Sequence, residues 1–180
     1  MLRDRFDRLA IAGILLVALT FGALLATAGT SAGRQADGSV SRQIEQELLA
    51  QAKLSFLERH YGPVAALRDG GELQTALLKL EELERKFPGE AHGMLMRGEI
   101  FYRLGLLDRA VASLALAVRG NGDYLDPASP LNQRDLIAVT VEQGIPLLRD
   151  RVRGQPDDQT AAATLKDAYY LQSRLAGGCE

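Results

Sequence analysis

Few side chains in this sequence could do chemistry near neutral pH. The available bases are two histidines, His60 and His92, and the one thiol is Cys179. Neither histidine has a serine or cysteine at a spacing typical of an activated nucleophile. The sequence contains no zinc-protease, nucleophile-elbow or phosphate-loop motif. We therefore expect a non-catalytic protein that uses no cofactor and no metal ion.

Three features that resemble sites have simpler interpretations. Gly70-Gly71 is not followed by Lys-Ser/Thr, so we interpret it as a helix–helix turn rather than a phosphate loop. Cys179 follows two glycines in a short tail, 177–180, and is either an exposed thiol or one that pairs with a partner protein. Interleaved acidic and basic residues indicate a solvated helix face rather than a metal site; they are Lys79, Glu81, Glu82, Glu84, Arg85 and Lys86.

The composition is that of a globular protein. Hydrophobic residues make up 47% of the 180 residues and charged residues 24%, which is enough for one packed domain. The formal net charge is −2, so the chain lacks the excess of basic residues that nucleic-acid binding requires. We expect a protein partner, and no nucleic acid or small-molecule substrate is evident.

The N-terminal part of the chain has the pattern of a membrane anchor. Residues 1–8 form a short basic segment with three arginines, and residues 9–28 are uncharged and rich in leucine. Twenty apolar residues in a helix span about 30 Å, the thickness of the hydrocarbon core. Residues 29–39 are rich in glycine, serine and alanine and predict a linker. Cleavage after Ala26-Thr27-Ala28, as in a secreted protein, is the alternative.

The positive charges predict how the anchor is oriented. Arg3, Arg5 and Arg8 crowd the first eight positions, whereas the opposite flank begins with Arg34 and Arg42 alone. The positive-inside rule therefore favours a cytoplasmic N-terminus. The expectation is a single-pass protein of a bacterial-type inner membrane, with its C-terminal domain in the periplasm.

Residues 40–61 predict an amphipathic helix. Val40, Ile44, Leu48, Ala52 and Phe56 recur every fourth residue, and charged residues lie on the other faces. We expect the Gly-Pro pair that follows to end this helix. The apolar stripe either packs on the rest of the domain or pairs with another helix, and the pattern leaves both possibilities open.

Beyond this helix, helix breakers and small residues repeat with a period of 34 residues. The breakers Pro88, Gly122 and Pro156 are spaced by this period. In the same phase stand small residues at 76, 110 and 144, leucines at 80, 114 and 148, and glycines at 71 and 105. Small residues let two helices cross closely, and large apolar residues one turn away fill the space between them.

This period and these residue types resemble the tetratricopeptide repeat. The best match covers His92 to Val118, with Met94, Gly98, Phe101, Gly105, Ala110, Leu114 and Ala117 at the family's positions. Two departures stand out. Arg97 occupies a position where the family has leucine, and Asp126-Pro127 with Ser129-Pro130 predicts a loop in place of a helix. The fold class expected from the resemblance is all-α: a membrane-spanning helix followed by a solenoid of helical hairpins over residues 62–176, closed by a capping helix.

The resemblance also implies a use for the domain. In tetratricopeptide proteins, the first helices of successive repeats line a groove that binds a segment of a partner. Transferred to this sequence, the expected groove residues are His92, Leu95, Met96, Glu99, Tyr102, Arg103, Asp167 and Tyr170. The first helix of the best repeat has apolar residues on several of its faces. Its side chains Leu95, Met96 and Tyr102 therefore either bind a partner or are covered by neighbouring helices. The family's clamp for chaperone C-termini is not matched, since Ala65, Met96 and Thr164 stand at its positions.

The resulting expectation is a membrane-anchored scaffold for protein interaction or assembly. Proteins of similar plan include accessory factors for envelope assembly and for cytochrome c maturation. The alternative is a structural subunit of a membrane complex, held through the anchor and the helix at 40–56. A freely secreted binding protein is a third possibility.

Overall fold

The computed structural model describes residues 44–177. The predicted basic segment, membrane anchor and linker, the first residues of the amphipathic helix and the end of the tail lie outside this range. Contacts divide the chain into two units, Met1–Ser55 and Phe56–Glu180. In the first unit the described residues, 44–55, are helical. Within the described range, no helix combines the length and the apolar character that crossing a membrane requires.

The second unit confirms the all-α fold class. Its described residues contain helices and turns and no strand. All described residues from 44 to 69 are helical, and we call them the 44–69 helix. The later elements are α2 (Leu73–Lys86), α3 (Ala91–Arg103), α4 (Leu107–Gly120), the short 3₁₀ helix η1 (Gly122–Leu125), α5 (Arg134–Gly154) and α6 (Gln159–Leu175).

The predicted helix end before Gly62-Pro63 is wrong. Both residues lie within the 44–69 helix, and Pro63 is on its exposed side. Tyr61 and Val64, on either side of the pair, are 2% and 0% exposed and belong to a core cluster. The burial of these side chains outweighs the hydrogen bond that proline cannot donate, because tertiary packing overrides local propensity.

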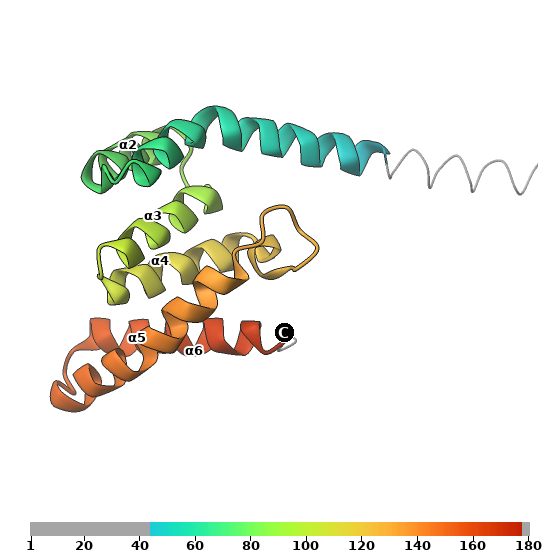
Figure 1. Cartoon of the computed structure of the whole chain (residues 1–180). Helices are drawn as coiled ribbons and strands as arrows, with labels where there is room; N and C mark the ends of the chain where they lie inside the picture. The colour runs from blue at the N-terminus through green and yellow to red at the C-terminus, as the bar shows by residue number, and fades with distance from the viewer. Residues whose placement is uncertain (1–43, 178–180) are drawn as a thin grey trace, which may run out of the picture. The chain divides into compact units, whose positions relative to one another are not determined.

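The helices form hairpins that stack in chain order (Figure 1). The 44–69 helix turns into α2 at Gly71, and α3 turns into α4 at Gly105. Both glycines have positive φ, 82° and 73°, which is the conformation that favours glycine at such turns. Helix α2 packs on α3, and α4 packs on α3, α5 and α6. The loop expected near Asp126-Pro127 is present, because η1 and a run of turns occupy residues 122–133.

Two hydrophobic clusters fill the second unit. One lies among the 44–69 helix, α2 and α3, and the other joins α3 and α4 to η1, α5 and α6. Leu131, in the loop before α5, packs against both clusters. A Cβ on Gly98 would lie 2.7 Å from Cγ of Leu114, so α3 and α4 cross closely at this glycine. A Cβ on Gly144 would lie 2.8 Å from Cγ2 of Val111, so α5 and α4 also cross closely.

The expected crossing residue Ala110 is also fully buried, with 0% exposure. We therefore predict that Ala110→Leu lowers the free energy of unfolding by about 1–3 kcal/mol through overpacking. The same change at Ala112, which is partly exposed on the same helix, should alter it by less than about 0.5 kcal/mol. Thermal melting of the two variants checks this, and equal melting temperatures would contradict the packing of α4.

Helix α6 begins at a charged cap. Asp158 accepts a hydrogen bond from the backbone N–H of Ala161 at 2.9 Å and one from Nε of Arg151 at 3.1 Å. The backbone hydrogen bond from Ala161, followed by the charge of Arg151, holds the pKa of Asp158 below its ordinary value of 3.8. The folded state thus binds a proton less readily than the unfolded state.

Ionisation of Asp158 makes the stability of the fold depend on pH. A depressed folded-state pKa stabilises the fold fully above the unfolded-state pKa, and this stabilisation is lost as the pH falls through the folded-state pKa. Asp158→Asn keeps a capping oxygen but no charge. Melting temperatures measured from neutral pH down to pH 3 should therefore fall less steeply for Asp158→Asn than for the wild-type chain. Parallel plots of melting temperature against pH for the two chains would show that the charge of Asp158 does not stabilise the fold.

Candidate functional site

Two of the predicted groove residues are buried within the chain. Leu95 and Met96 on α3 are 5% and 3% exposed, so neither can contact a partner directly. Leu95 packs in the same cluster as Tyr124 and Leu125, which come from η1. Met96 packs in the other cluster, against the 44–69 helix and α2. Helix α3 is therefore covered on two sides, by one core cluster at Leu95 and by the other at Met96.

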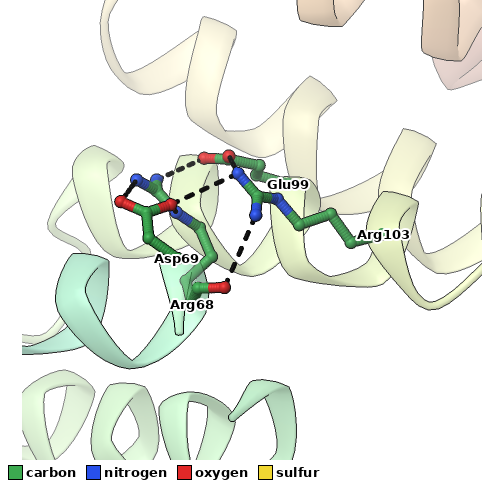
Figure 2. A network of polar contacts seen from close by, with 4 residues as sticks. All are labelled: Arg68, Asp69, Glu99 and Arg103. Carbon is green, nitrogen blue, oxygen red and sulfur yellow. Dashed lines mark hydrogen bonds and ion pairs between the residues drawn. The ribbon is translucent and has the colours of Figure 1, made fainter. Parts of the chain in front are cut away.

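Two further groove residues, Glu99 and Arg103, are engaged in a charge network (Figure 2). Arg68 donates to Asp69 through Nε and Nη2, at 2.9 and 3.0 Å, and to Oε2 of Glu99 at 2.6 Å. Arg103 donates to Oε1 of Glu99 at 3.0 Å and approaches Asp69 at 3.4 Å. The network joins the end of the 44–69 helix to α3, so these charges serve the contact between two helices.

The pKa shifts in this network agree with the contacts. The hydrogen bonds to the Asp69 carboxylate raise the pKa of the Arg68 guanidinium, with the charge of Glu99 adding to the effect. The hydrogen bond from Arg68 lowers the pKa of Asp69. Both groups are therefore held in their charged forms by each other. A partner that bound Glu99 or Arg103 would have to compete with these intrachain contacts.

His92 lies near the start of α3 among aromatic rings. Its backbone N–H donates to the Glu90 side chain, which caps the helix, at 3.4 Å. Its ring meets Tyr61 edge to face, with centroids 5.1 Å apart, and lies 6.3 Å from the ring of Tyr124. Burial raises the pKa of Tyr61 to about 12, with the negative charge of Glu90 adding to the effect. The surroundings of His92 are therefore those of a packed side chain between helices.

The remaining predicted groove residues lie elsewhere. Tyr102 on α3 accepts a hydrogen bond from the Gln143 amide of α5 at 3.3 Å. On α6, Asp167 pairs with Arg119 of α4 at 2.6 Å, and the Arg119 guanidinium lies 4.5 Å from the ring centroid of Tyr170. The structure thus ties the eight predicted residues to several separate intrachain contacts. It joins Glu99 with Arg103 in one network and places Asp167 and Tyr170 at the same arginine, Arg119.

An open groove lies on another face of α3, between α2 and α4. Its volume is about 580 Å³, and its walls come from all three helices. The lining residues are Leu77, Glu81 and Glu84 of α2, Arg97 and Phe101 of α3, and Arg109, Ala112 and Ser113 of α4. We call this the α2–α3–α4 groove. Apolar side chains and charges of both signs share it.

Two of the four charges in the groove are paired within the chain. Nη2 of Arg97 lies 2.5 Å from Oε2 of Glu84, which joins α3 to α2. The Arg109 guanidinium lies 5.7 Å from the ring centroid of Phe101, and no described carboxylate pairs with it. The backbone carbonyl of Glu81 accepts a hydrogen bond from Arg85 at 3.3 Å, and its carboxylate pairs with none of the residues in the described range. One cation and one anion in the groove are thus left for solvent or a ligand.

One residue of the sequence, Arg97, indicates this groove, although by itself it is only a departure from the repeat pattern. Arg97 stands where the tetratricopeptide repeat has leucine, and a leucine there would pack between neighbouring repeats. The arginine instead turns to Glu84 and leaves its surroundings polar. The surface between α2 and α3 is therefore charged at this point, where the sequence pattern predicts an apolar residue.

A second exposed feature lies in the first unit. Ile44, Leu48 and Leu49 are 53%, 61% and 64% exposed on the helical residues 44–55. Together with Ala52 they form an apolar stripe, named here the 44–52 stripe. Within the described range, no group of histidine, cysteine, aspartate and glutamate side chains is arranged to hold a metal ion.

Comparison with known proteins adds no further constraint. No protein-family model and no curated protein sequence matches the chain.

Proposed function

We propose that this chain is a non-catalytic protein-interaction scaffold of the tetratricopeptide type, anchored in a membrane by residues 9–28. The anchor follows from the apolar run in the sequence, and the repeat type follows from its 34-residue period. By the positive-inside rule the helical domain lies in the periplasm. An accessory role in the assembly of envelope proteins or of cytochrome c fits this plan.

The observation that carries the proposal is the α2–α3–α4 groove. It is open along the contact of three helices, and it offers apolar surface at Leu77 and Phe101 together with two charges that pair with no residue of the described range. Most small-molecule sites enclose their ligand in an apolar cavity with a few polar groups. An open groove with a mixed lining is typical of protein interfaces, in which a few anchoring side chains dominate the affinity.

The 44–52 stripe favours a second function, that of a structural subunit. Large exposed apolar patches on soluble surfaces mark interaction sites. In this alternative the chain is held in a membrane complex through its anchor and this stripe, and the groove is unused. Leu48→Ser with Leu49→Ser would then release the chain from its complex, whereas under the scaffold proposal it would leave partner capture unchanged.

The experiment that separates these functions is a comparison of matched arginine variants. The full chain is extracted in mild detergent, and captured proteins are identified by mass spectrometry. Ala112→Arg places a long charged side chain in the groove, so we expect it to abolish capture of the partner found with the wild type. Ala163→Arg, the same change at an exposed position of α6, should leave capture unchanged. Equal capture by both variants would remove the groove from the proposal.

A further inference from the structure

We propose that the α2–α3–α4 groove recognises a peptide segment in which an apolar side chain is flanked by an acidic residue on one side and a basic residue on the other. This inference rests on the proposed scaffold function and names the chemistry of its partner. The occupant is a segment of another protein, and the argument comes from the arrangement of charges around the apolar surface.

The apolar surface provides a place for the central side chain. Leu77, Phe101 and Ala112, one from each helix, are all partly exposed in the lining of the groove. A side chain such as leucine that covers them removes apolar area from water on both partners.

Arg109 supplies the recognition of an acidic residue. Its guanidinium is held over the ring of Phe101 and has no carboxylate partner among the described residues. An arginine in cation–π contact with a ring keeps its N–H groups available for bidentate hydrogen bonds to a carboxylate.

Glu81 supplies the recognition of a basic residue on the opposite wall. It lies on α2, whereas Arg109 lies on α4, and the other two charges of the lining, Glu84 and Arg97, neutralise each other. The groove therefore presents an anion at one wall and a cation at the other. A peptide with charges of one sign would pair with either Arg109 or Glu81 and leave the other charge unpaired. Such a peptide should bind more weakly than one that carries both charges.

The test is a peptide selection on the full chain in detergent micelles. A random-peptide phage library is panned against the wild type, Arg109→Glu, Glu81→Lys and the double variant Arg109→Glu with Glu81→Lys. The wild type should enrich peptides with an apolar residue between an acid and a base. Each single charge reversal should weaken the binding of those peptides by about ten- to a hundredfold. The double reversal should enrich peptides in which the acidic and the basic residue have changed places.

The outcomes separate this inference from the proposed function. Melting curves establish that each variant is folded, and a folded double variant that selects the same peptides as the wild type overturns the inference. So does a wild-type selection without any shared charge pattern. If Ala112→Arg nevertheless abolishes capture of the cellular partner, the scaffold function is supported and only the inferred acidic–apolar–basic pattern of the peptide is wrong. If Ala112→Arg captures the partner normally, the scaffold function falls as well.

Discussion

Leu95→Ala should lower the free energy of unfolding by about 2–5 kcal/mol, the usual cost of removing a buried leucine side chain. Leu95 is 5% exposed and packs among residues of α3, α4 and η1. Its truncation removes apolar contacts and leaves a cavity that the surrounding helices fill only in part. For a small domain this is a large share of the total stability. Chemical denaturation monitored by circular dichroism measures the change.

Leu78→Ala is the matched control for this variant. Leu78 lies on α2 and is 63% exposed, so the same loss of atoms should change the free energy of unfolding by no more than about 0.5 kcal/mol. The comparison decides between the two interpretations that the sequence left open for Leu95. A Leu95→Ala variant as stable as Leu78→Ala would place Leu95 on the surface and restore it as a candidate groove residue.

Gly98→Leu should lower the free energy of unfolding by about 3 kcal/mol, at the upper end of the usual cost of overpacking. A Cβ at this position would already lie 2.7 Å from Cγ and 3.2 Å from the backbone nitrogen of Leu114. Because the second of these atoms belongs to the main chain, rotation of a side chain cannot relieve the clash. Helices α3 and α4 would have to separate, and this cost exceeds the gain of about 1 kcal/mol from replacing a helical glycine.

Gly154→Leu is the control for Gly98→Leu. Gly154 is the last residue of α5 and is exposed, and a Cβ there would meet nothing within 4 Å. This variant should be unchanged or more stable by up to about 1 kcal/mol. Thermal melting should show a clear loss of stability for Gly98→Leu and no loss for Gly154→Leu. A neutral Gly98→Leu would mean that α3 and α4 do not cross at this glycine.

Much of the fold was predictable because its signals are local. Gly71 and Gly105 end helices through a backbone conformation that depends on one residue, and the pattern of small and large residues marks the hairpins around them. The loop at Asp126-Pro127 followed from the same kind of signal. The continuation of a helix through Gly62-Pro63 did not, because it depends on core packing of the residues beside the pair.

The candidate site was harder to predict for the same physical reason. Periodicity identifies an apolar face of α3, but it cannot say which element covers that face. Leu95 shares a core cluster with residues of η1, α5 and α6, which lie far along the chain. The charge of Arg97 was visible in the sequence, yet its meaning depends on Glu84 of the preceding hairpin. Both cases depend on nonlocal contacts that spacing alone does not encode.

The central claim is that a partner protein occupies the α2–α3–α4 groove, and photo-crosslinking within cells tests it most directly. A photoreactive benzoylphenylalanine replaces Ala112 in the groove or, as a control, Ala163 on the exposed side of α6. Irradiation of the full-length variants should yield a discrete crosslinked partner from position 112, lost when Arg109→Glu is added, and none from position 163. Absence of an adduct at position 112, or the same adduct from both positions, would contradict the claim.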